Sequence, residues 1–154
     1  MIFSVNKLYK HNIKMRLFTV GYSGKNEVKF FEILRKAGVS RIIDVRRFRF
    51  SKFVPFASEI NLQKKCKHKY SIIEQVAPSR ELLDCWQKGE IAWSFYEREY
   101  KKYLESIYAE KFFTKEFLSN ACLLCMEEKP AQCHRRLLAE YLSEKFEDIE
   151  VIHL

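Results

Sequence analysis

The feature that most constrains this chain is the early alternation of strand-like and helix-like segments. Residues 16–20 are apolar and β-branched and end at the turn Gly21-Tyr-Ser-Gly24, which is typical of a buried strand. Residues 27–37 carry apolar side chains at helical spacing, and residues 41–45 form a second apolar run. A strand, a helix and a strand within about 30 residues indicate a βαβ unit, in which the two strands run parallel.

The rest of the chain continues this alternation. The further predicted strands cover 69–73, 121–125 and 148–152, and the further predicted helices cover 58–66 (with Ser58 as its N-cap), 78–88, 91–108, and 132 or 133 to 142. The stretch 46–57 lacks a helical period and contains Pro55, which predicts a loop. The pattern predicts an α/β fold: a single layered domain with a mainly parallel sheet flanked by helices.

Length and composition favour one folded domain. The chain has 154 residues, of which 47% are hydrophobic and 15% aromatic, enough for a true core. We predict the domain at residues 15–154, preceded by a leader segment at 1–14 that could hold a small strand within 3–9.

Several classes of protein are disfavoured. No apolar run approaches the roughly 20 residues of a membrane span, and the first residues do not resemble a secretion signal. Five cysteines, an odd number, suit reduced thiols better than a disulfide framework. We therefore expect a cytoplasmic protein without a membrane partner.

Positive charge is concentrated in one window. The net charge is +8, and residues 41–69 hold nine basic side chains against two acidic ones, which leaves an excess of seven. Such a field attracts nucleic acid, nucleotides or other anions, although a solvated basic face without a partner is an equal alternative. The nucleic-acid contacts expected from this window are Arg47, Arg49 and Lys52.

Polar residues follow three of the predicted strands. Ser23 lies in the turn after the first strand, Asp44-Val45-Arg46 ends the second, and Cys125-Met-Glu127 ends the fourth. Parallel sheets bind ligands beyond the carboxyl ends of their strands, so these groups are expected to converge on one rim. Asp44 could act as a base or orient a cation, and Arg46 and Ser23 could bind an anion. The structural alternative is a buried Asp–Arg pair that only pins the following loop.

The segment from Cys125 to Arg136 is the most informative. Cys133, His134 and Arg135 fall at a predicted helix start, where free N–H groups and the helix dipole favour anions. The same field is expected to lower the pKa of Cys133 and make it a nucleophile, with Asp44 or Glu127 as acid or base. The alternative is that Cys133 is a small packing residue.

A metal site receives separate consideration. Cys122 and Cys125 have CxxC spacing, and Cys133 and His134 could complete four ligands. On a strand, however, Cys122 and Cys125 point to opposite faces, and the neighbours Cys133 and His134 would share one zinc ion awkwardly. We therefore expect no metal and no other cofactor.

Three segments together carry a family resemblance. They read Thr19-Val-Gly-Tyr-Ser23, Ile43-Asp-Val-Arg46 and Leu124-Cys-Met-Glu-Glu-Lys-Pro-Ala-Gln-Cys-His-Arg135. The chain resembles the family catalogued as domain of unknown function 488 from about residue 15 to 142. Tyr22 stands where the family often has His, so no role for that His is carried over.

The resemblance implies an α/β fold and a shared polar site, but no particular activity. The site residues that it implies are Asp44, Arg46, Glu127, Cys133, His134 and Arg135. A fainter likeness to rhodanese-type domains, with Asp-Val-Arg after a strand and a Cys in a later strand-to-helix loop, is an analogy of fold only.

Three functional hypotheses remain open. The first is a small enzyme acting on a phosphorylated small molecule or nucleic acid, with Cys133 as nucleophile and His134, Arg46 and Arg135 binding the anion. The second is a non-catalytic nucleic-acid-binding module that uses the basic window. The third is a structural polar cluster. Oligomeric state cannot be predicted.

Overall fold

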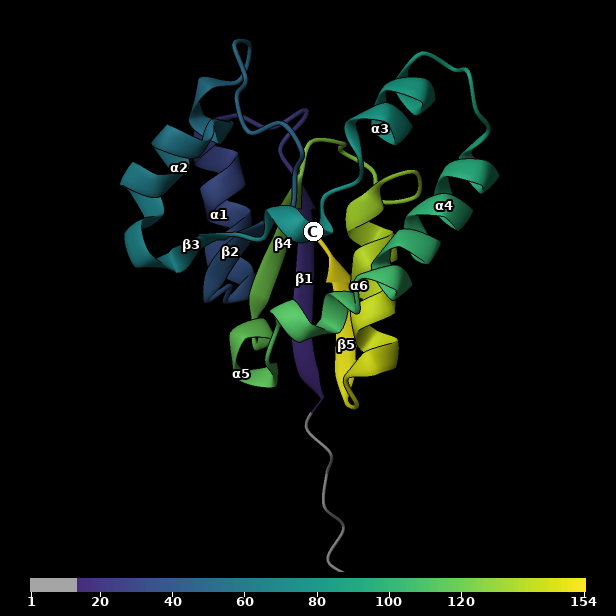
Figure 1. Cartoon of the computed structure of the whole chain (residues 1–154). Helices are drawn as coiled ribbons and strands as arrows, with labels where there is room; N and C mark the ends of the chain where they lie inside the picture. Colours follow the sequence, from purple (N-terminus) through teal and green to yellow (C-terminus); the bar gives the residue numbers. More distant parts are fainter. Residues whose placement is uncertain (1–13) are drawn as a thin grey trace, which may run out of the picture.

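The computed structural model describes residues 14–154, and its centre is a five-stranded, all-parallel sheet in the order β3-β2-β4-β1-β5 (Figure 1). The strands are β1 Met15–Gly21, β2 Arg41–Asp44, β3 Tyr70–Ile72, β4 Ala121–Cys125 and β5 Ile149–His153. The predicted α/β fold is confirmed. The possible strand within 3–9 and most of the predicted leader lie outside the described residues.

Six α-helices flank the sheet. They are α1 Glu27–Ala37, α2 Glu59–Cys66, α3 Arg80–Gln87, α4 Trp93–Ser106, α5 Lys115–Leu118 and α6 His134–Lys145. Figure 1 places α1 and α2 on one side of the sheet and α4 and α6 on the other. Within residues 14–154, no helix has both the length and the apolar character needed to span a membrane.

The helix boundaries follow from local chemistry. Asn26 caps α1 by accepting a 2.9 Å hydrogen bond from the Lys29 N–H, and Gly38 ends that helix with φ of 75°. Ser58 precedes α2 as predicted, but its side chain does not cap the helix. Its hydroxyl instead donates to the Ser51 carbonyl oxygen and accepts from the Ser51 N–H, which closes the loop after β2. The short helix α5 was not predicted, because four residues carry no periodic signal.

The alternation of side chains along the strands builds two cores. Leu17, Ile43 and Leu123 pack on the side of α4 and α6, whereas Phe18 and Leu124, with their equivalents on β2, pack on the side of α1. The three inner strands β2, β4 and β1 contribute buried residues to both cores, as is usual for parallel sheets. The half-exposed pattern predicted for the last strand agrees with its place at the edge.

Candidate functional site

The loops that follow β1, β2 and β4 meet at the carboxyl edge of the sheet. The backbone N–H of Val45 donates to the Leu124 carbonyl at 3.4 Å, and those of Tyr22 and Ser23 donate to Cys125 and Met126 at 3.2 and 3.0 Å. Pairing therefore continues past the strand ends and holds the three loops side by side. The residues singled out from the sequence form two polar clusters at this edge.

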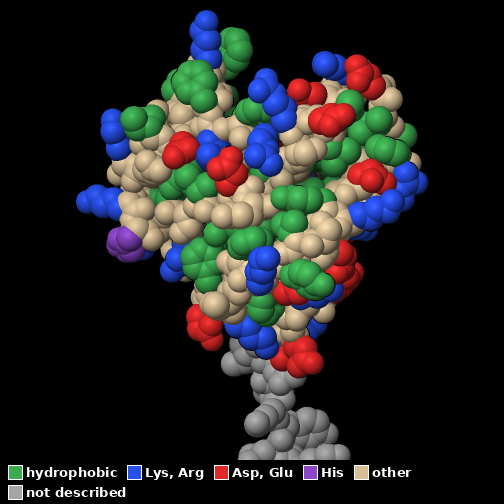
Figure 2. Space-filling model, in the orientation of Figure 1, with side chains coloured by type: hydrophobic (Ala, Val, Ile, Leu, Met, Phe, Trp, Pro, Cys, Tyr) green, Lys and Arg blue, Asp and Glu red, His purple; other side chains and the backbone are tan. Residues whose placement is uncertain are grey.

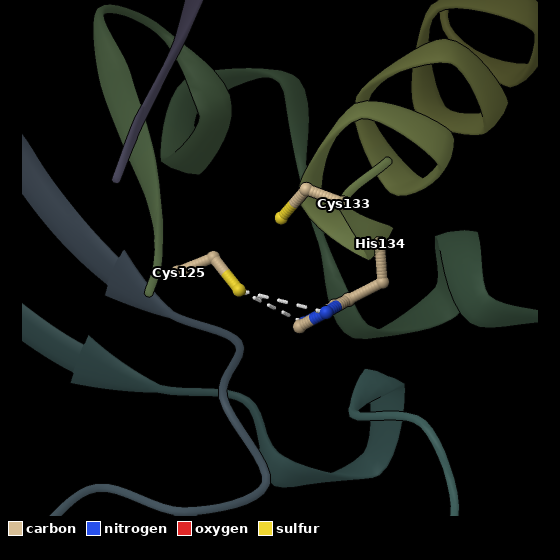
Figure 3. Close-up of side chains that lie close together, drawn as sticks. All are labelled: Cys125, Cys133 and His134. Atoms are coloured by element: carbon tan, nitrogen blue, oxygen red, sulfur yellow. Dashed lines mark hydrogen bonds between the residues drawn. The ribbon is translucent and has the colours of Figure 1, made fainter. Parts of the chain in front are cut away.

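The first, which we call the thiol cluster, consists of Cys125, Glu127, Cys133 and His134. The thiols of Cys125 and Cys133 donate to Glu127 Oε2, with sulfur–oxygen distances of 2.9 and 3.0 Å. Cys125 Sγ also lies 3.5 Å from His134 Nδ1. Figure 3 shows the two cysteines and the imidazole turned toward a common point between β4 and the start of α6.

The orientation of His134 is set by the end of β2. Its Nε2 lies 2.9 Å from the Val45 carbonyl oxygen. A carbonyl can only accept, so Nε2 carries the hydrogen, and in the neutral ring Nδ1 is the nitrogen without one. Cys125 Sγ lies 3.5 Å from Nδ1 and 3.8 Å from Nε2, to the side of the ring. The ring of Tyr100 packs edge-on against the imidazole, with centroids 5.7 Å apart.

The surroundings of the thiols favour their protonated form. Burial raises the pKa of Cys133 well above its ordinary value, and its contacts with Cys125 raise it further. Burial also raises the pKa of Cys125. Burial would raise the pKa of Glu127 too, but the hydrogen bonds from both thiols lower it, so this group is the carboxylate. The lowered pKa expected for Cys133 from the helix start is wrong, because burial and the contacts with Cys125 outweigh the lowering effect of His134.

Arg135 holds the loop that carries Glu127. Its fully buried guanidinium donates to the carbonyl oxygens of Glu127 and Glu128, at 2.5 and 3.1 Å, and to Thr19 Oγ1 at 3.3 Å. These donors are thus occupied by protein acceptors. Gly21 makes the approach possible, because a Cβ there would lie 1.6 Å from the Glu127 carbonyl oxygen.

The second, which we call the guanidinium cluster, consists of Asp44, Arg46 and Tyr70. Arg46 donates Nε to Asp44 Oδ1 at 2.9 Å and Nη2 to Oδ2 at 2.6 Å, a bidentate pair. The Tyr70 hydroxyl donates to the same carboxylate at 2.5 Å. Asp44 and Arg46 are both buried, and the ring of Tyr22 lies beside the guanidinium, 5.3 Å from its carbon.

The charges of the guanidinium cluster stabilise each other. Burial alone would lower the pKa of Arg46, but the hydrogen bonds and charge of Asp44 raise it above its ordinary value. Burial and the nearby carboxylate raise the pKa of Tyr70, which stays protonated. Nη1 of Arg46 is the one buried side-chain nitrogen or oxygen in residues 14–154 without a hydrogen-bond partner. The cluster therefore keeps an unused cationic donor.

The two clusters lie on opposite faces of the sheet. Ile43 and Val45 pack with the core below α6, so Asp44 between them faces the α1 side, where Tyr22 and Tyr70 also pack. Cys125 faces α6, and Cys122 packs on the α1 side, as strand alternation predicts. The backbone of Val45 joins the clusters, since its carbonyl holds His134 and its chain neighbours are Asp44 and Arg46.

The residues predicted to contact nucleic acid lie in the loop after β2. Arg47 donates to the carbonyls of Ala77 and Pro78, and Arg49 pairs with Glu59 and Glu74. Lys52 is exposed. Ser23, predicted to bind an anion, is partly exposed beside the loop after β4.

Sequence reasoning left Cys125, Tyr70 and Gly21 out of the predicted site residues. Cys125 ends β4 on the same face as His134, which strand alternation could have indicated. Tyr70 joins Asp44 only because β3 pairs with β2, a register that is not readable from local pattern. Gly21 was noticed as a turn residue, and its close contact with Glu127 is tertiary.

Comparison with known proteins identifies the family alone. No curated protein and no solved structure matches the chain significantly. The sequence model of the family described as "Domain of unknown function DUF488" matches residues 27–142, a segment that includes both clusters. Since this match covers well over half of the chain, the protein belongs to the DUF488 family.

Proposed function

We propose that this protein is a small enzyme that acts on a phosphate-containing substrate at the carboxyl edge of its sheet. The observation that carries the proposal is the thiol cluster, in which a carboxylate oxygen lies 2.9 and 3.0 Å from two sulfur atoms. A nucleophile within hydrogen-bond reach of a proton acceptor is the arrangement that covalent catalysis requires.

Each residue of the thiol cluster has a proposed role. Cys133 is the nucleophile. Burial keeps its thiol protonated, so Glu127 accepts the proton only as the sulfur attacks phosphorus and the bond to the leaving oxygen breaks. His134 is held by Val45 and orients the neighbouring sulfur. Arg135 is a positioning residue, because its donors hold the loop carbonyls instead of a ligand.

The guanidinium cluster supports an anionic substrate. Nη1 of Arg46 is buried and without a partner, and a buried cationic donor of this kind gains most from an anionic acceptor. Asp44 orients the guanidinium through two hydrogen bonds. Ser23 is the further proposed anion ligand, from the loop after β1. A substrate that contacts both clusters would lie across the edge of the sheet near Val45.

The test is a turnover assay on phosphate monoesters, nucleotides and short oligonucleotides. Cys133→Ser should lower the rate by roughly 100-fold or more, whereas Cys85→Ser, outside both clusters, should keep it. Full turnover by Cys133→Ser would remove the thiol from the mechanism.

A second candidate function has its own observation. The loop between β2 and α2, which extends away from the sheet in Figure 1, exposes Phe50 and Phe53 at 79% and 91%. Figure 2 shows hydrophobic and basic side chains side by side at the top of the molecule. Exposed aromatic rings beside cations bind single-stranded nucleic acid by stacking.

Measurements of oligonucleotide binding, without a turnover assay, distinguish this second function from the first. Replacing Phe50 and Phe53 with Ala should weaken binding of a single-stranded oligonucleotide by roughly 10-fold or more, since stacking contributes about 1–3 kcal/mol per base. Replacing Arg47, Arg49 and Lys52 together should flatten its salt dependence. Unchanged affinity in both variants would exclude this loop as a nucleic-acid surface.

A further inference from the structure

The thiol cluster has the composition and spacing of a metal-binding site. Cys125 Sγ, Cys133 Sγ and a ring nitrogen of His134 lie within 4.8 Å of one another, and all three residues are buried. Thiolate and imidazole are the ligands that zinc prefers, whereas magnesium and calcium prefer oxygen. The donor set therefore selects a borderline or soft divalent cation.

The separations fit one tetrahedral ion. Bonds of about 2.3 Å from zinc to sulfur and about 2.0 Å to nitrogen, at a tetrahedral angle, place those two ligand atoms about 3.5 Å apart. Cys125 Sγ and His134 Nδ1 are 3.5 Å apart. The three ligand atoms are close enough to share one cation once the imidazole turns to direct Nδ1 at it.

The tautomer of the imidazole already suits a metal ligand. Histidines that bind metals commonly donate their second ring N–H to a carbonyl or carboxylate, which directs the other nitrogen to the ion. His134 makes this contact through Nε2 and the Val45 carbonyl at 2.9 Å. Nδ1 is then free of hydrogen, and Figure 3 marks the contacts of Cys125 with both ring nitrogens.

The neighbours Cys133 and His134 reach the same point because a helix begins between them. Cys133 is the N-cap of α6 with an extended backbone, φ −138° and ψ 135°, and His134 is the first helical residue. This change of conformation turns the two side chains toward Cys125. From the sequence, these two neighbouring residues were expected to share one zinc ion awkwardly, and the change of conformation removes that objection.

We propose that Cys125, Cys133 and His134 bind one zinc ion, with Glu127 beside the fourth position. Three protein ligands with one position left open is the pattern of catalytic zinc sites, whereas structural sites use four. Binding would release one proton from each thiol to solvent, and Glu127, which accepts from both sulfur atoms, is placed to pass these protons on one at a time. The inference concerns the same residues as the proposed function, but metal binding requires no substrate. Cys133 would act as a free nucleophile only in protein that has no metal bound.

The test uses the full chain, reduced and freed of metal with a chelator in the absence of oxygen. Cobalt(II) should bind with one-to-one stoichiometry and give the sulfur-to-metal charge-transfer band and intense d–d bands of a tetrahedral thiolate site. Zinc should then displace it. Absence of a one-to-one complex would overturn the proposal.

Variants locate the ion. Cys133→Ser should weaken cobalt and zinc affinity by on the order of 100-fold or more, whereas the double variant Cys66→Ser and Cys85→Ser should bind like the wild type. Circular dichroism of each variant checks that it is folded, and Cys125→Ser is the second test if Cys133→Ser is not. Wild-type affinity in a folded Cys133→Ser or Cys125→Ser variant would contradict the site, whatever the turnover assay gives. If the wild-type cluster binds metal and Cys133→Ser keeps full turnover, the role of Cys133 as nucleophile is wrong and the metal site stands.

Discussion

The two clusters at the carboxyl edge are both largely buried, with only Glu127 partly exposed, but they are chemically opposite. The guanidinium cluster presents hydrogens, since Asp44 is saturated by Arg46 and Tyr70 and one Arg46 nitrogen keeps unused hydrogens. The thiol cluster presents lone pairs, from two sulfur atoms, the Glu127 carboxylate and Nδ1 of His134. The difference teaches that one sheet edge can present hydrogen-bond donors on one face and lone pairs on the other.

This comparison predicts that changes in the guanidinium cluster lower the free energy of unfolding more than changes elsewhere at this edge. Asp44→Ala would leave a buried guanidinium without its counter-charge, and we expect a loss of about 3–5 kcal/mol in the free energy of unfolding. Urea denaturation measures it. The double variant Asp44→Leu and Arg46→Met removes both charges and should recover most of the loss. A loss below about 1 kcal/mol for Asp44→Ala would mean that the pair is not buried as described.

A smaller loss in the free energy of unfolding is expected when Tyr70, the third member of that cluster, is changed. Tyr70→Phe removes the hydrogen bond to Asp44 Oδ2, and bonds to charged groups contribute about 1.5–3 kcal/mol. Tyr22→Phe is the matched control, because it keeps the ring beside Arg46 and should change stability by less than about 0.5 kcal/mol. Equal effects of the two variants, in the same denaturation experiment, would assign no role to the Tyr70 hydroxyl.

The close contact between Gly21 and the Glu127 carbonyl predicts a loss of stability similar to or smaller than that of Tyr70→Phe. Gly21→Ala forces the Glu127 carbonyl away from β1, and overpacking of this kind costs about 1–3 kcal/mol. Gly89→Ala, at φ of 71° but with open space around it, should cost about 1 kcal/mol from the backbone alone. Only Gly21→Ala should also weaken cobalt binding. If both variants bind cobalt like the wild type, the Glu127 loop does not shape the site.

The smallest effect is expected in the loop after β2. Arg49 pairs with Glu59 and Glu74, which are both well exposed, and such pairs contribute at most about 1 kcal/mol. Glu59→Gln should therefore lower the melting temperature only slightly. A large drop would show that this loop, and not the clusters, limits stability.

Local patterns predicted the fold well and the site in part. Strand and helix periodicity placed every strand of the sheet to within one or two residues, because buried parallel strands are continuous apolar runs. The same logic brought Asp44 and His134 to one edge, although it did not assign them to different faces. The face of Asp44 follows from counting along β2, where it alternates with Ile43 and Val45.

The contacts between distant segments could not be predicted. That Tyr70 reaches Asp44, and that Val45 holds His134, depend on the strand order β3-β2-β4, which local periodicity does not specify. The pKa of Cys133 was predicted in the wrong direction because the helix start is visible in the sequence, whereas the burial that outweighs it is not.

The most direct test is the tautomer of His134, read from the nitrogen–hydrogen couplings of its ring in the metal-free protein by NMR. We expect the neutral ring to carry its hydrogen on Nε2, bonded to Val45, which leaves Nδ1 without a hydrogen and able to bind a metal ion. A hydrogen found on Nδ1 instead would occupy the nitrogen that is proposed to bind the metal ion. It would contradict the division between a face with unused hydrogens and a face with lone pairs.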